Sequence, residues 1–111
     1  MTTDDGRVVC ARCVVAKAPW TRMRGLLGRS SLDAHEGMLF PRTGSIHMLF
    51  MRFAIDAIFC DRDLVVLHVE RGLRPWRMAS RRGAKTVIEL AAGAAAGVEP
   101  GDRLSLATID A

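Results

Sequence analysis

The segment Ser45–Phe59, SIHMLFMRFAIDAIF, limits what this chain can fold into more than any other stretch. Most of its side chains are apolar, which is typical of a buried strand, yet it also contains His47, Arg52 and Asp56. Charged side chains are almost never fully buried unless they are paired. The segment is therefore either a structural strand whose charges have partners or the wall of a functional site.

Alternation along a strand divides these side chains between two faces. The odd positions from 47 to 59 are almost all apolar, and the even positions carry Arg52 and Asp56 among further apolar residues. We expect both faces to be largely buried. On a straight strand Arg52 and Asp56 lie roughly 13 Å apart, too far for a direct ion pair without a bulge. Each charge therefore needs a partner elsewhere in the chain.

The sequence offers candidate partners for both charges. An arginine could pair with Asp56, the candidates being Arg24, Arg29 and Arg77, whereas Glu36 or Glu89 could pair with Arg52. Two interpretations stay open, a buried polar network that fixes strand register and a ligand-binding cleft. The residues of this candidate network or cleft are Arg24, Arg29, Glu36, His47, Arg52 and Asp56.

Short apolar runs separated by turn residues fill most of the remaining chain. Residues 7–16 are predicted to form the first strand, and the other β-rich runs are EGMLF at 36–40, AIFC at 57–60, LVVLHV at 64–69, TVIEL at 86–90 and RLSLAT at 103–108. Asp61, Arg62 and Asp63 supply a hairpin turn between two of these runs. Helical spacing after Pro19 predicts a short helix that ends near Gly28, and AAGAAAGV at 91–98 permits one or two helical turns. Hairpins rather than βαβ units indicate a mainly β, compact antiparallel barrel or sandwich with one or two short helices.

Length and composition indicate one globular domain. The chain has 111 residues, of which 50% are hydrophobic and 25% charged, so residues 1–111 are expected to form a single domain with a disordered N-terminus at 1–6. No apolar run reaches the roughly 18 residues that a membrane span requires. The first ten residues are acidic where an export signal is basic. We therefore expect no membrane partner and a cytoplasmic location.

The segment Arg71–Lys85, RGLRPWRMASRRGAK, concentrates positive charge in a chain whose net charge is +4. It contains six cations and no carboxylate, which favours an exposed loop that attracts anions. Trp76 could stack on a ligand or could fill the core. The candidate ligand-binding residues are Arg71, Arg74, Trp76, Arg77, Arg81 and Arg82.

Cysteine spacing indicates neither a metal site nor a disulfide. Cys10 and Cys13 form a C-x-x-C motif, but β-branched neighbours place it in a strand, where residues three apart lie roughly 10 Å from each other on opposite faces. Cys60 stands alone. We predict that all three thiols are reduced and bind no metal.

Several motifs along the chain resemble a known family. They are RGLLGR at 24–29, EGMLF at 36–40, IHMLFMRFAIDAIFCD at 46–61, PWR at 75–77 and EPGDRL at 99–104. The chain is similar to the small prokaryotic proteins grouped as domain of unknown function 192. The resemblance implies a compact, mainly β fold and brings no established activity, substrate or catalytic residue. Leu49 and Ala54 stand where such proteins often have an aromatic residue and a proline.

Two classes of function remain open. We favour a non-enzymatic binding module that recognises a small anionic or polar ligand through the Arg-rich surface beside Trp76. The alternative is a small hydrolase-like or isomerase-like enzyme with Asp56 and His47 in a cleft, although no nucleophile motif or phosphate loop accompanies them. The sequence assigns no catalytic residue, metal or cofactor, argues against a nucleic-acid partner, and leaves the oligomeric state open.

Overall fold

The computed structural model describes residues 2–3, 12–15, 36–47, 53–75 and 77–105. Within these ranges the chain forms strands and turns. The strands are β1 (Thr2–Thr3), β2 (Arg12–Val15), β3 (Glu36–Pro41), β4 (Ser45–His47), β5 (Ile55–Cys60), β6 (Val66–Leu73), β7 (Met78–Ser80), β8 (Thr86–Ala91) and β9 (Leu104–Ser105).

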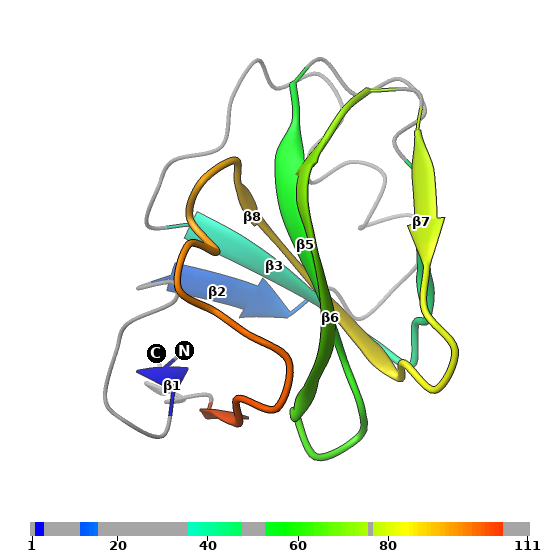
Figure 1. Ribbon diagram of the computed structural model, residues 1–111, viewed down its shortest axis with the longest axis vertical. Helices are drawn as coiled ribbons and strands as arrows, with labels where there is room; N and C mark the ends of the chain where they lie inside the picture. The colour runs from blue at the N-terminus through cyan, green and yellow to red at the C-terminus, as the bar shows by residue number, and fades with distance from the viewer. Residues whose placement is uncertain (1, 4–11, 16–35, 48–52, 76, 106–111) are drawn as a thin grey trace.

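A five-stranded sheet forms the centre of the molecule, with the strand order β2-β3-β8-β5-β6 (Figure 1). Strands β2 and β3 are parallel, and every other pair in this sheet is antiparallel. Two antiparallel ribbons, β4–β7 and β1–β9, complete the described strands. The prediction of a mainly β, antiparallel fold is confirmed, but the described strands do not close into a barrel.

Helices are absent from the part of the chain that the structure describes, and so is any helix long and apolar enough to cross a membrane. The helix predicted near residues 19–28 lies outside the described residues. In the segment 92–98, the bonds from Ala94 N–H to Ala91 and from Val98 N–H to Ala95 close successive tight turns. Gly93 and Gly97 have φ values of 91° and 87°, and this left-handed backbone prevents the turns from continuing as a helix. The cytoplasmic location stays a prediction.

The prediction of one continuous strand over Ser45–Phe59 is wrong. Strand β4 pairs with β7, whereas β5 pairs with β6 and β8, so the two halves of the segment belong to different sheets. A straight strand of this length would extend roughly 50 Å, and the longest dimension of the molecule is 35 Å. The chain must therefore change direction, and residues 53–54 lie outside any strand.

Both faces of β5 are buried, as the alternation predicts. On one face Ile55, Ala57 and Phe59 join a core cluster with residues of β3, β6 and β8, and Ala79 of β7 packs against it. On the other face Ile58 belongs to a second cluster, which the segment after β8 covers. That segment contributes Ala95, Val98 and Leu104. The sheet is therefore the middle layer of the molecule.

The predicted hairpin between β5 and β6 is confirmed. Its turn is closed by the side chain of Asp61, whose Oδ1 accepts N–H bonds from Asp63 at 2.8 Å and from Val65 at 3.0 Å. Leu64 adopts a left-handed φ of 62° to complete the turn. This hairpin places Arg62 at the end of the sheet where two further turns meet.

Candidate anion-binding site

Three turns meet at one end of the five-stranded sheet, and we call this region the turn end. It consists of residues 42–44 between β3 and β4, residues 61–65 between β5 and β6, and residues 81–85 between β7 and β8. Backbone bonds connect them. Thr43 N–H donates to the carbonyl of Lys85 at 2.9 Å, and Arg81 N–H donates to the carbonyl of Gly44 at 3.1 Å. These bonds fix the backbone of the connected turns, and therefore the points from which their side chains extend.

Lys85 also connects the third turn to the hairpin, because its N–H donates to the carbonyl of Cys60 at 2.8 Å. Figure 1 shows the β5–β6 turn and the connection from β7 to β8 at the same lower end of the molecule. The sheet therefore brings together turns that lie about twenty residues apart in the sequence.

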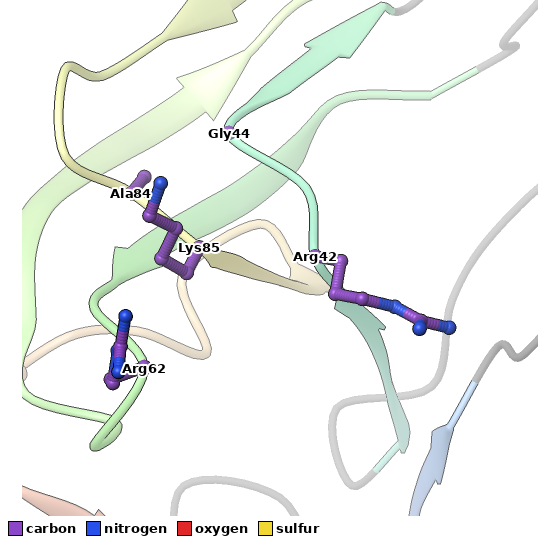
Figure 2. A pocket seen from close by; sticks show the side chains of 5 residues that line it. All are labelled: Arg42, Gly44, Arg62, Ala84 and Lys85. Carbon is purple, nitrogen blue, oxygen red and sulfur yellow. The ribbon is translucent and has the colours of Figure 1, made fainter.

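An open pocket of about 540 Å³ lies at the turn end (Figure 2). Each of the three turns contributes a cation, and the lining residues are Arg42, Gly44, Arg62, Ala84 and Lys85. All three cations are exposed, and none of the described lining residues is acidic. In Figure 2 Arg62 and Lys85 occupy one side of the pocket, and the side chain of Arg42 extends on the other. Cations from all three turns thus flank the pocket, with the side chain of Arg42 directed away from the other two.

Close backbone packing restricts one lining position of the pocket to glycine. A Cβ atom on Gly44 would come within 2.9 Å of the carbonyl oxygen of Ala84, so only glycine fits without a backbone shift. Thr43 is buried, and its Oγ1 donates to the carbonyl of Pro41 at 3.1 Å. Arg42 has a left-handed φ of 54°, a conformation that costs a non-glycine residue roughly 1–2 kcal/mol. The chain therefore has a charged residue at a position where glycine would be less strained.

The net charge of the turn end is positive. Its three turns carry five cations, Arg42, Arg62, Arg81, Arg82 and Lys85, and two carboxylates, Asp61 and Asp63. These charges sum to +3. One oxygen of Asp61 already accepts two N–H bonds inside its own turn. The basic residues therefore dominate the field over the pocket.

The structure divides the predicted ligand-binding segment Arg71–Lys85 between two ends of the molecule. The expectation of a single exposed loop is wrong, because the segment contains the end of β6 and all of β7. Arg81 and Arg82 are exposed on the turn end. Arg74 and Arg77 are exposed in the β6–β7 connection, which Figure 1 places at the opposite end of β7. Trp76 lies outside the described residues.

Arg71 binds the segment after β8 through its guanidinium group. Its Nη1 donates to the carbonyl of Ala95 at 2.7 Å and its Nη2 to the carbonyl of Val98 at 2.6 Å. The carboxylate of Glu99 lies 3.5 Å from Nη2. The guanidinium thus holds the turns of residues 92–98 against β6.

Asp56 holds the same segment from inside the core. Its side chain is 1% exposed, and its carboxylate accepts N–H bonds from Gly72 at 2.9 Å and from Gly93 and Ala95 at 3.0 Å each. The described partners of Asp56 are backbone amides and not the predicted arginine. Arg77, one of the predicted arginines, is exposed in the β6–β7 connection. The bulge in β5 at Asp56 lets the carboxylate reach both neighbouring segments. This geometry supports the structural interpretation of Asp56.

Other residues of the predicted network are only partly described. Arg24, Arg29 and Arg52 lie outside the described residues. Glu36 begins β3 and His47 ends β4, but the structure describes only their backbone. Glu89, the alternative partner for Arg52, is buried in β8.

Sequence reasoning missed Arg42 and Arg62 as site residues. Each is a single cation in a short turn, so neither stands out from its neighbours in the sequence. The available signal was weak: Arg62 is the middle residue of the predicted hairpin turn, and Arg42 follows Pro41 at the end of an apolar run. Only the pairing of β3, β5 and β8 brings them together with Lys85.

The described residues contain no group of three His, Cys, Asp or Glu side chains that could hold a metal ion. Cys13 lies in β2, which confirms residues 12–15 of the strand predicted over residues 7–16, and Cys10 lies outside the described residues. Cys60 is a free, buried thiol. Burial raises the pKa of this thiol to about 12, and the nearby Asp61 carboxylate adds to the effect.

Comparison with known sequences gives a family match over most of the chain. A family model described as "Uncharacterized ACR", the domain of unknown function 192, matches residues 1–106. A UPF0127 protein of Thermococcus sibiricus is 34% identical over 93 residues, 79% of this chain and 60% of that relative. A UPF0127 protein of Pyrococcus furiosus is 44% identical over 63 residues, 54% of this chain and 53% of that relative. This chain therefore spans less than two thirds of either relative.

Two crystal structures have a similar fold. A protein of unknown function from Novosphingobium aromaticivorans matches with a TM-score of 0.80 and 28% identity, covering 95% of this chain and 81% of that chain. A candidate transcription regulator from Sinorhizobium meliloti matches with a TM-score of 0.74 and 28% identity, covering 94% of this chain and 88% of that chain. Both likenesses agree with the mainly β architecture described above.

Proposed function

Because this chain belongs to the domain of unknown function 192 family, whose activity is unknown, we propose its function from the site: a non-enzymatic module that binds an anionic ligand at the turn end. One observation carries the proposal. Three separate turns, tied together by backbone hydrogen bonds, each place a cation on the same open pocket.

Physical chemistry favours anion binding at such a pocket. Arg42 and Arg62 can each donate two parallel N–H bonds to a phosphate or carboxylate, and Lys85 adds a compact charge. These cations are exposed and can stay partly hydrated when an anion binds. The large desolvation cost of a buried ion pair therefore does not arise. Arg81 and Arg82 lie on the same turn as Lys85 and increase the positive potential around the pocket.

The binding surface is narrower than the Arg71–Lys85 segment. Arg71 is engaged with the carbonyls of Ala95 and Val98, so it is not part of the proposed site. Arg74 and Arg77 lie beyond β7, a strand of three residues that extends roughly 10 Å. They are also outside the proposed site.

The enzyme alternative has less support from the described residues. A general acid or base must reach the proton that it transfers. Asp56 is buried, and three backbone N–H groups occupy its carboxylate. It is a poor candidate for chemistry on a ligand in solvent.

A nucleic-acid ligand is a second candidate because the Sinorhizobium meliloti neighbour is named a candidate transcription regulator. The positive turn end is compatible with phosphate backbone contacts. We favour a small anion, since a pocket rather than a long basic stripe carries the charge.

Two charge-matched double variants test the proposal. Arg62→Ser with Lys85→Ser removes two cations from the pocket, and Arg74→Ser with Arg77→Ser removes two from the far end of β7. Isothermal titration with tripolyphosphate at low salt should show at least about a tenfold loss of affinity for the first variant, or about 1.4 kcal/mol. The second variant should bind like the parent chain. Equal losses in the two variants, or no binding of any anion by the parent, would contradict the proposal.

A further inference from the structure

We infer that the ligand of the turn end is a small molecule with two phosphate groups joined by a short uncharged spacer. This inference rests on the proposed function and specifies the chemical class that the pocket takes. It follows from the pocket's size, from the placement of its cations and from their number.

The size of the pocket fits a small organic molecule. Its volume of about 540 Å³ lies within the range of small-molecule sites, roughly 300–1,000 Å³. A single inorganic phosphate would fill only part of that space and leave the remainder to water.

The cations stand on two sides of the pocket, with Gly44 between them. Arg62 and Lys85 occupy one side and Arg42 extends on the other (Figure 2). In the same view Gly44 lies between Lys85 and Arg42, while Ala84 lies beside Lys85, and these two residues offer backbone and a methyl group rather than charge. One anionic group can therefore meet Arg62 and Lys85 and a second can meet Arg42, while an uncharged spacer passes Gly44.

Charge balance favours phosphate over carboxylate at both ends. The turn end has a net charge of +3 from five cations and two carboxylates. Two phosphate monoesters carry roughly −3 to −4 together near neutral pH, whereas two carboxylates carry only −2. A bisphosphate thus neutralises the site more completely. Arginine forks also match phosphate geometry.

A polymer fits the site less well than a bisphosphate. Asp61 and Asp63 flank Arg62 in the hairpin turn, and Asp63 is exposed. A nucleic-acid backbone that continued across this hairpin turn would meet like charge. A ligand that ends at the pocket avoids this repulsion.

Titration calorimetry with a matched pair of sugars tests the inference: fructose 1,6-bisphosphate and fructose 6-phosphate share one sugar and differ by one phosphate. The bisphosphate should bind with one-to-one stoichiometry and at least about tenfold more tightly than the monophosphate, a difference of about 1.4 kcal/mol. Inorganic phosphate and a single-stranded oligonucleotide complete the series of probes.

A single substitution tests the contribution of one side of the pocket separately from that of the other. Arg42→Asn removes one cation and keeps a residue that tolerates left-handed backbone. It should lower the affinity for the bisphosphate to that for the monophosphate, and should leave monophosphate binding at Arg62 and Lys85 nearly unchanged. Arg74→Ser, with the same loss of charge outside the site, should change neither affinity.

The possible results distinguish this inference from the proposed function. Equal binding of the two sugars, or tight binding of the oligonucleotide alone, would overturn the bisphosphate and leave an anion-binding turn end in place. Binding of none of the four probes and of no tripolyphosphate would overturn both.

Discussion

Asp56 occupies the central strand with its carboxylate out of reach of water, and three backbone amides replace the solvent that it loses. Burial of a carboxylate without such donors would be very costly. The amides come from Gly72 before the end of β6 and from Gly93 and Ala95 in the turns after β8. One side chain thus ties the end of β6 to the turns that follow β8.

Replacing Asp56 with Ala should destabilise the fold by about 2–4 kcal/mol, because three amide donors would lose a charged acceptor in a buried site. Urea unfolding of the purified variant measures the change. Asp63→Ala is a suitable control, since Asp63 is an exposed carboxylate in the hairpin turn and should cost less than about 0.5 kcal/mol. Similar losses in the two variants would show that the amide bonds to Asp56 contribute little.

Cys60 should resist thiol reagents in the folded protein. Its neutral thiol is favoured because burial raises its pKa from 9.0 to about 12. In a Cys10→Ser, Cys13→Ser background, a disulfide reagent at mildly alkaline pH should react slowly with native protein and rapidly in urea. Fast reaction of the native protein would mean that β5 opens readily.

The same pKa shift has a defined effect on stability. A thiol whose folded-state pKa is raised contributes stability that is fully present below its unfolded pKa of 9.0 and is lost as the pH rises toward about 12. The parent chain should therefore lose more stability across this window than the Cys60→Ala variant, as measured by urea unfolding at each pH. Parallel pH profiles would contradict the raised pKa.

Sequence reasoning at this scale identified the buried charge but not its partner. Apolar neighbours on both sides predicted that Asp56 is buried and must be paired, and the structure shows three bonds to it. The partner was expected to be an arginine. Backbone amides carry no sequence signature, and the glycines at 72 and 93 become donors only through left-handed φ values of 64° and 91°.

At the scale of elements, local signals predicted the hairpin and nonlocal pairing decided the rest. Asp61, Arg62 and Asp63 marked the turn between β5 and β6 correctly because a turn depends on neighbouring residues. The break between β4 and β5 was missed, since apolar alternation continues through both strands. It depends on β7 as a partner more than thirty residues away. Arg42 and Arg62 escaped notice as site residues for the same reason.

The β3–β4 turn should show a trade between stability and binding. Arg42→Gly removes the strain of a left-handed φ at a non-glycine residue and should stabilise the fold by about 0.5–1 kcal/mol. The same change should weaken anion binding, because the pocket loses one of its lining cations. Urea unfolding and calorimetry on one preparation measure the two effects.

Arg62→Gly is the matched control for this trade. It removes a cation from the same pocket, but Arg62 has an ordinary negative φ, so glycine brings only the entropy cost of a flexible residue. This variant should be less stable than the parent chain by about 0.5–1 kcal/mol. If both glycine variants change stability in the same direction, backbone strain at Arg42 is not the cause.

At the scale of the whole molecule, a net charge of +4 describes the protein less well than the position of its charges. Both faces of the sheet carry buried core clusters, and the exposed cations of the turn end lie on loops at one of its ends. One end carries the Asp56 and Arg71 bonds that hold residues 92–98. The turn end has exposed cations, and among the described residues few hydrogen bonds or ion pairs engage their side chains. The molecule thus has one end held by internal bonds and another end that presents the proposed binding site.

Salt dependence follows from a local site of this kind. The turn end presents a net charge of +3 on three turns, whereas a protein that tracks a nucleic acid neutralises many phosphates and releases many counterions. Affinity for fructose 1,6-bisphosphate should therefore fall by less than about tenfold between 50 and 200 mM salt, against roughly 10³–10⁵ for a surface with 6–10 phosphate contacts. Calorimetry at four salt concentrations gives the slope directly. A slope as steep as that of a nucleic-acid-binding surface would mean that cations well beyond Arg42, Arg62 and Lys85 take part, and that the natural ligand is a long polyanion.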